Sequence, residues 1–294
     1  MRRLSRLNWL LLAVAAPTAA HDLGPAGHHD LPGWTLDPAI VVPLFLAATA
    51  FATGWRRLTA RAGRGRAALR RRGRLFAAGM IVLTVALVSP LHEAGERSFA
   101  AHMAEHELLM LVAAPLLVLA EPLAIMLWAW PLPIRRAIGA MAAGVAAPWR
   151  LATGPVAATL VQAAALWLWH VPALFDRALA RESWHLAQHL SFLIAALLFW
   201  TAMFHRRTAR AMAALCLVAT SIVSGALGAL MAFATSPWYA GYSRLGMAPF
   251  GLTPAEDQQI AGLLMWVPGG LVHAGAALIA MRGLLREERP RHAL

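Results

Sequence analysis

The amino-acid sequence predicts an all-α fold: a polytopic membrane protein with a bundle of seven transmembrane helices, preceded by a signal peptide. Hydrophobic residues make up 60% of the 294 residues, and charged residues make up only 14%. Seven long apolar stretches follow the N-terminus, and a helix needs roughly 20 apolar residues to cross a bilayer. Backbone polar groups inside lipid need internal partners, so these stretches must form helices of one bundle. The stretches run approximately over residues 38–55, 75–91, 104–130, 152–170, 185–204, 211–233 and 257–281.

The N-terminus has the pattern of a secretory signal peptide. Three arginines precede a short apolar run at 9–16, and small residues follow at 18–20. An uncleaved anchor with the same topology is the alternative. No linker is long enough to hold a second domain. The predicted organisation is a signal peptide at 1–20, a histidine-containing periplasmic segment at 21–37, a seven-helix transmembrane domain at 38–281 and a cytoplasmic tail at 282–294.

The arginines predict the orientation of the bundle. Arginine supplies all 26 basic residues, and 22 of them lie in the signal, the loops at 56–74, 131–151 and 205–210, and the tail. The positive-inside rule therefore places these segments in the cytoplasm. We expect a multi-pass protein of a bacterial inner membrane with a cytoplasmic C-terminus. The net charge of +12 follows from this topology and from contact with anionic lipids, so the bilayer is an expected partner and nucleic acid is not.

The histidines have the opposite distribution. Nine of the twelve lie outside the membrane or at the outer ends of the predicted helices. Imidazole is the commonest metal ligand in proteins, so this asymmetry indicates a metal site facing the periplasm. A general tolerance of histidine for membrane interfaces is the alternative explanation.

Two similar pentapeptides, His-Met-Ala-Glu-His at 102–106 and His-Leu-Ala-Gln-His at 185–189, carry four of the outer histidines. Helical residues four apart share a face and stand roughly 6 Å apart, so each pair can aim two imidazoles at one point. The short outer connection between the fourth and fifth stretches brings His170 close to the second pair. The predicted metal ligands are therefore His102, His106, His170, His185 and His189.

Four side chains near the first pair or the last helix are candidates for supporting roles. Met110 continues the face of the first pair at position i+8, although ordinary packing is the simpler reading. Glu105 can orient a ring nitrogen, as carboxylates often do at metal sites. The thioethers of Met103, Met110 and Met265 can stabilise a reduced ion.

Three further residues complete the candidate set. Asp176 can accept from an imidazole N–H or cap a short surface helix. Asp257 follows the capping box that opens the last helix and is favourable at a helix N-terminus whatever its function. If the signal is cleaved after Ala20, the mature chain begins at His21, whose amine and imidazole can together chelate copper.

The ligand chemistry favours copper. The single Cys216 cannot form a thiolate pair or an intrachain disulfide. Imidazole with nearby thioether, facing an oxidising compartment, suits Cu(I) or Cu(II), and zinc remains chemically open. The segment 106–110 resembles a zinc protease motif but has Met110 where the second histidine is required. No nucleophile, general base or phosphate loop stands out, so we expect no enzymatic activity.

Four segments together resemble the CtaG family of cytochrome c oxidase assembly factors, of the seven-span integral membrane type. They are HMAEHELLMLVAAPLLVLAEPL, WLWHVPALFDRAL, HLAQHLSFLIAALLFW and DQQIAGLLMWVPGGLVH, in order and spacing from about residue 38 to 281. The resemblance carries the family's histidine motifs onto the five predicted ligands and its acidic motif onto Asp257 and Gln258. Glu107 and Glu121 depart from the family pattern.

The resemblance implies a role in the maturation of haem-copper oxidases, with copper held at the periplasmic face and delivered to the oxidase metal centres. The implied partners are cytochrome c oxidase subunits or another copper chaperone, and a homo-oligomer is left open. One alternative is a haem-binding membrane protein that uses histidines of two helices as axial ligands. Another is a metal transporter across the inner membrane that uses Glu121 and His273 as steps.

Overall fold

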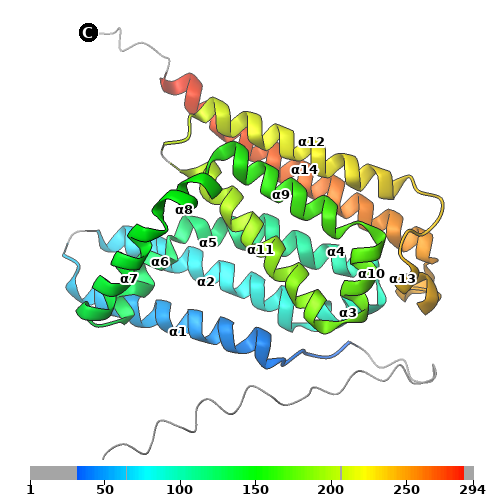
Figure 1. Ribbon diagram of the computed structural model, residues 1–294, viewed down its shortest axis with the longest axis horizontal. Coiled ribbons are helices and arrows are strands. Elements are labelled where there is room, and N and C mark those ends of the chain that lie inside the picture. Colours follow the sequence, from blue (N-terminus) through cyan, green and yellow to red (C-terminus); the bar gives the residue numbers. More distant parts are fainter. Residues whose placement is uncertain (1–31, 64, 206, 288–294) are drawn as a thin grey trace, which may run out of the picture. The chain divides into compact units, whose positions relative to one another are not determined.

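The structure, a computed structural model, describes residues 32–63, 65–205 and 207–287. These residues belong to one structural unit, and its regular elements are helices (Figure 1). The predicted signal peptide at 1–20, the candidate ligand His21 and the end of the tail lie outside the described residues. The all-helical part of the fold prediction is therefore confirmed.

Five helical segments are long and apolar enough to cross a membrane. They share a high hydropathy over at least 18 residues and a low content of charged side chains. They are α1 (Pro38–Arg61), the segment Phe99–Ala120, α11 (Glu182–Phe204), α12 (Arg210–Ala232) and α14 (Pro254–Glu287).

Two bent helix pairs lie where the second and fourth apolar stretches were expected. The first is α2 (Arg66–Val88) with α3 (Pro90–Arg97), bent by 42°, and the second is α8 (Ala146–Ala152) with α9 (Pro155–Trp169), bent by 69°. Proline begins the second helix of each pair, because its fixed φ suits a first helical position and disfavours a helical residue before it. Counting each pair as one span gives up to seven spans, so the predicted number stays a prediction.

The segment Phe99–Ala120 is built from three helical elements. It begins with α4 (Phe99–Glu107), continues through the π-helix η1 (Leu108–Ala113) and ends with α5 (Ala114–Ala120). The short helices that complete the described chain are α6 (Pro122–Met126), η2 (Leu127–Ala129), α7 (Leu132–Gly144), α10 (Pro172–Ala180), α13 (Ala240–Leu245) and η3 (Pro249–Gly251).

Glu121 falls within the third apolar stretch expected at 104–130, but the helical span ends before it. The span ends at Ala120, and Glu121 adopts a left-handed conformation with φ of 47°. The following Pro122 disfavours a right-handed helical residue before it, which stops the helix here. Glu121 is exposed, and its Oε2 lies 2.7 Å from a guanidinium nitrogen of Arg72. This carboxylate therefore pairs with an arginine of α2.

Small residues bring the last two long helices together. α12 and α14 run side by side along one side of the unit (Figure 1). A Cβ added at Gly262 would lie only 2.5 Å from the carbonyl oxygen of Gly228, so these backbones are in direct contact. Helices in membranes commonly associate through such small residues. α14 also packs against α4, and α11 packs against α9 and α5, which places α4 and α11 inside the bundle.

Candidate metal centre

The two histidine pairs predicted from the sequence lie against each other. His102 and His106 of α4 have ring centroids 4.4 Å apart, as do His185 and His189 of α11. Between the helices, the ring of His102 lies 5.3 Å from that of His185, and the ring of His106 lies 4.8 Å from that of His189. The four imidazoles therefore form one group, which we call the histidine cluster.

The histidine cluster is more deeply covered than a site at the outer surface would be. His102, His106 and His189 are only 1%, 4% and 6% exposed. His185 is half-buried and lies in the first turn of α11, which begins at Glu182. The cluster is therefore an internal site with an edge that reaches the surface.

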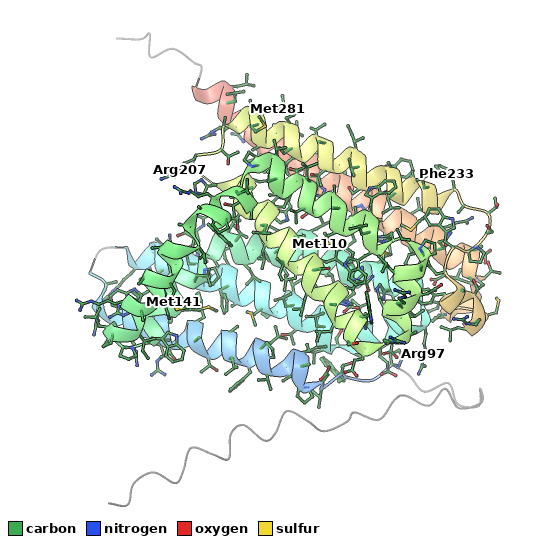
Figure 2. The ribbon with its side chains drawn as sticks, in the orientation of Figure 1. Arg97, Met110, Met141, Arg207, Phe233 and Met281 are labelled. Atoms are coloured by element: carbon green, nitrogen blue, oxygen red, sulfur yellow. The ribbon has the colours of Figure 1, made fainter. Side chains whose placement is uncertain are left out.

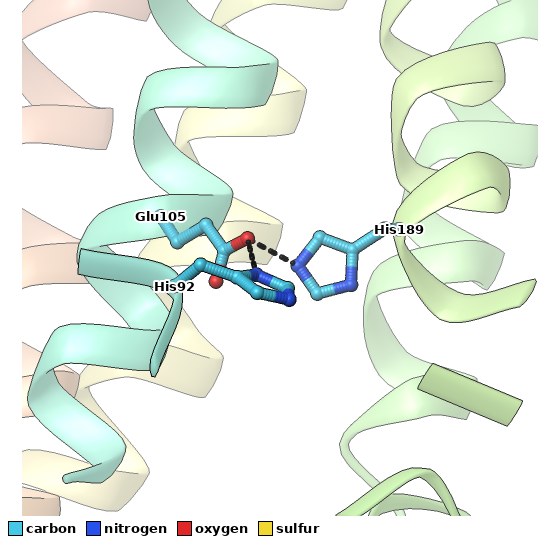
Figure 3. Close-up of side chains that lie close together, drawn as sticks. All are labelled: His92, Glu105 and His189. Atoms are coloured by element: carbon cyan, nitrogen blue, oxygen red, sulfur yellow. Dashed lines mark hydrogen bonds and ion pairs between the residues drawn. The ribbon is translucent and has the colours of Figure 1, made fainter. Parts of the chain in front are cut away.

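A fifth histidine and a carboxylate join the cluster. His92 of α3 stacks on His185 with ring centroids 5.3 Å apart. Its Nδ1 lies within hydrogen-bond distance, 2.7 Å, of Glu105 Oε1. The same oxygen lies 3.0 Å from His189 Nε2 (Figure 3). One ligand atom from each of His92, Glu105 and His189 falls within 4.8 Å of the others, close enough to share a metal ion.

His189 lies between a carbonyl group and the carboxylate of Glu105. Its Nδ1 donates to the carbonyl oxygen of His185 at 3.0 Å, because a carbonyl can only accept. Its Nε2 lies 3.0 Å from the carboxylate oxygen of Glu105, in a contact without hydrogen-bond geometry. A cation, either a proton or a metal ion, can be shared between this nitrogen and this oxygen.

Several other polar atoms of the site also have no hydrogen-bond partner within the described residues, although they are buried. Buried polar groups in proteins are normally hydrogen-bonded, so these atoms are free to bind water or an ion. Nitrogen and carboxylate oxygen atoms of this kind fit a copper or zinc ion. The atoms are His102 Nε2, Glu105 Oε2, both ring nitrogens of His106, and His185 Nε2.

His170 lies beside the cluster, at the end of α9, and not among the contacting rings. Its Nδ1 donates to the carbonyl oxygen of Leu166 at 2.7 Å, so Nε2 presents a lone pair. That nitrogen faces the sulfur of Met103 at 3.4 Å, and both side chains are buried. His170 and Met103 therefore form a nitrogen and sulfur pair next to the cluster.

Asp257 positions the helix that carries the first histidine pair. Its carboxylate accepts hydrogen bonds from the Ser98 hydroxyl at 2.8 Å, from Phe99 N–H at 2.6 Å and from Ala100 N–H at 3.3 Å. These groups form the N-terminus of α4, where unpaired N–H groups favour a negative charge. Asp257 is buried at 2% exposure and has both oxygens occupied in this way. The geometry therefore gives Asp257 a capping role.

Asp176 also caps a helix. Its Oδ1 accepts from the N–H of Gly241 at 2.9 Å, at the start of α13. Of the two alternatives drawn from the sequence, capping a short helix matches this contact. Asp176 thus joins α10 to α13 beside the cluster.

Met110 lies on η1, directly after the helix that carries His102 and His106. The expectation assumed an unbroken α-helix, but η1 has the wider turn of a π-helix, in which the N–H of Ala114 bonds to the carbonyl of Leu109. Met110 is buried inside the bundle (Figure 2), and together with Met265 it lines a separate internal cavity. π-turns inside α-helices are frequent at functional sites.

Aromatic side chains cover the cluster on one side. The ring of Phe175 contacts those of His102 and Phe99, at 5.2 Å in each case. Tyr239 donates its hydroxyl to the carbonyl of His170, and Tyr242 donates to the carbonyl of Gly95. Burial raises the pKa of both phenols above the ordinary value, so they stay neutral donors. This cover holds α3, α9 and α10 in place around the site.

Sequence reasoning missed His92. It has no partner four residues away on its own helix, so no spacing motif marks it, and only its place among the outer histidines gave a signal. It also missed that Glu105 touches two imidazoles from two other helices, because this is a tertiary contact.

One of three comparisons with known proteins gives a match. The model of the family described as cytochrome c oxidase caa3 assembly factor matches residues 49–287, which include every residue of the histidine cluster. Searches among curated proteins and among solved structures found no match. The matched region covers most of the 294 residues. The chain therefore belongs to the cytochrome c oxidase caa3 assembly factor family.

Proposed function

We propose that this assembly factor binds a copper ion at the histidine cluster, on the periplasmic side of the membrane, and passes it to an oxidase subunit. The observation that carries the proposal is the group of five imidazoles around the buried carboxylate of Glu105. Its ring nitrogens are largely unpartnered, and a metal ion would satisfy them. The family places the protein in oxidase assembly, and the oxidase is a copper enzyme by class.

Copper is favoured over zinc by the neighbouring sulfur. Imidazole and carboxylate suit Cu(II), and the pair of Met103 and His170 adds a soft donor that suits Cu(I). A site that must release its ion needs looser coordination than a structural site. The half-buried His185 gives the cluster an edge from which an ion can leave.

Haem is disfavoured by the packing of the rings. The imidazoles contact one another directly at centroid distances between 4.4 Å and 5.9 Å. A porphyrin would have to separate these rings, whereas a single ion would not. An absorption spectrum of the purified protein without a Soret band is the expected result.

Copper analysis of the purified, detergent-solubilised protein after loading with Cu(II) tests the proposal. We expect His102→Ala, His189→Ala and the newly identified His92→Ala each to lose the copper ion held at the cluster. His205→Ala is the matched control, because this exposed histidine lies at the opposite end of α11. Copper contents equal to wild type in all three cluster variants would contradict the proposal.

Delivery is tested in cells that depend on this assembly factor. The His102→Ala chain, present in the membrane at the wild-type level, is expected to yield oxidase with less bound copper. Full copper content in the oxidase would mean that the assembly function does not depend on copper binding at the cluster.

A further inference from the structure

A small internal cavity lies deeper in the bundle than the histidine cluster. Its volume is about 40 Å³, and it is lined by residues of α4, η1, α9, α12 and α14. One water needs roughly 10–15 Å³ of such space, so the cavity holds a few waters or one ion and excludes organic ligands. Met110 and Met265 both line it, and both are buried.

Three polar side chains of this cavity have buried atoms without a partner in the described chain. They are Glu107 Oε2, Gln162 Oε1 and His273 Nε2. Gln162 and His273 are only 3% and 2% exposed. An unpaired polar group inside a membrane protein is costly, and an intramembrane carboxylate usually marks an ion or proton site.

All three of these atoms can accept, and beside the amide N–H groups of Gln162 the lining offers them few donors. His273 Nδ1 donates to the carbonyl of Gly269 at 2.8 Å, so Nε2 carries a lone pair. The lining hydroxyls of Thr159, Thr220 and Ser224 each donate to a carbonyl of their own helix, at distances of 2.8, 2.9 and 2.8 Å. The cavity is thus rich in lone pairs and suits a cation.

The glycine at 269 brings the carboxylate and the imidazole to the same place. A Cβ added there would lie 3.5 Å from Glu107 Oε2, so the carboxylate rests over this bare backbone. The carbonyl of the same residue orients His273. Trp200 stacks on His273 with an interplanar angle of 2°, and its Nε1 donates to the carbonyl of Met110. These contacts hold the carboxylate of Glu107 and the imidazole of His273 in place.

We propose that this cavity is a second metal site, for a soft monovalent cation such as Cu(I). Its donors are the imidazole of His273, the thioethers of Met110 and Met265, and the carboxylate of Glu107. Thioether sulfur is a soft ligand that selects Cu(I), and one carboxylate neutralises one positive charge. The choice of copper rests on the function proposed above, whereas the existence of the site rests on the cavity alone.

The two sites are joined by consecutive residues of one span. His106 belongs to the histidine cluster, and Glu107, the next residue, belongs to the cavity. Met110 follows on η1. The same ion would then have two binding sites in this chain, the histidine cluster with nitrogen donors and the cavity with sulfur donors.

The test uses the full-length double variant His102→Ala/His189→Ala, loaded with Cu(I) under anaerobic reducing conditions in detergent. Copper content and the X-ray absorption spectrum are measured. We expect one Cu(I) per chain to remain, with sulfur among its neighbours. Adding Met110→Leu and Met265→Leu should remove the sulfur neighbours and weaken Cu(I) binding at least tenfold. Leucine conserves the side-chain volume, so the fold is retained.

Met281→Leu is the matched control, because this exposed methionine of α14 does not line the cavity. The proposal is overturned if the double variant binds no Cu(I), if its copper has only nitrogen and oxygen neighbours, or if both methionine changes leave the spectrum unchanged. These outcomes indicate a water-filled cavity. They are distinct from failure of the histidine cluster, which shows as equal Cu(II) contents in wild type and cluster variants.

Discussion

At the scale of single residues, Glu105 places a buried carboxylate against two imidazoles of the histidine cluster. It is completely buried, and one of its oxygens lies against ring nitrogens of His92 and His189. Removing its charge keeps the shape of the side chain but takes away the group that attracts a cation. The effect of such a change separates electrostatics from packing.

Glu105→Gln is therefore expected to lower copper affinity on the order of 10- to 100-fold, as losses of carboxylate partners do at other metal sites. Competition titration with a copper chelator measures the change. Glu121→Gln, which alters an exposed carboxylate after the C-terminal end of α5, should leave the affinity unchanged. Equal affinities for Glu105→Gln and wild type would mean that the carboxylate has no part in holding the ion.

At the scale of helices, the orientation of α4 depends on a residue far away in the sequence. Asp257 of α14 accepts three hydrogen bonds from the first residues of α4 and its cap. Hydrogen bonds to a charged group contribute about 1.5–3 kcal/mol each, and their loss leaves buried N–H groups unpaired. The cluster thus depends on contact between α4 and α14.

Asp257→Ala should lower the free energy of unfolding by at least about 4 kcal/mol, because three hydrogen bonds to a charged group are lost together. Thermal or denaturant unfolding in detergent, followed by helix signal, checks this value. Asp257→Asn should recover part of the loss, since an amide oxygen still accepts from the N–H groups. A direct metal ligand would behave differently, with copper content lost and the stability of the metal-free protein unchanged.

The contact between α12 and α14 allows a second test at this scale. Gly262→Ala would place a Cβ against the backbone of α12 and is expected to destabilise the protein by about 1–3 kcal/mol, the usual range for overpacking. Gly275→Ala, in the same helix with open space around it, is the control and should be neutral or slightly stabilising. Similar melting temperatures for both variants would contradict the close approach of the two helices.

At the scale of the whole molecule, the distribution of arginines predicts the orientation in the membrane. The arginine-rich loops and the histidine cluster should face opposite sides of the membrane. In a Cys216→Ala background, a cysteine at Glu96 should react with a membrane-impermeant thiol reagent in intact cells whose outer membrane is permeabilised. A cysteine at Arg136 should react only after disruption of the inner membrane. The reverse pattern would place the cluster in the cytoplasm.

Most of the helical content was predictable because apolar length alone determines it. The contact between the two histidine pairs was only a hypothesis from the sequence, because residues four apart share a helix face but no local pattern brings the third and fifth stretches together. Pro122 disfavours a right-handed helical residue before it, so a helix end at Glu121 could have been predicted. Both residues lie inside a long apolar run, which favoured a continuous helix instead. The partnership of Glu105 with His92, the cap by Asp257 and the π-turn of η1 depend on tertiary contacts. Local sequence patterns do not predict these contacts, because they join residues that are far apart in the chain.

The π-turn of η1 has a consequence for how the two sites are related. A turn closed between residues five apart contains one residue more than an α-turn, so η1 is equivalent to a single inserted residue within Phe99–Ala120. Each residue of an α-helix advances the face by about 100°. Shortening η1 by one residue would rotate α4 by that angle against α5, and the histidine cluster would turn together with Glu107 of the cavity. The orientation of both sites relative to α5 is therefore encoded in chain length, independently of which side chains fill η1.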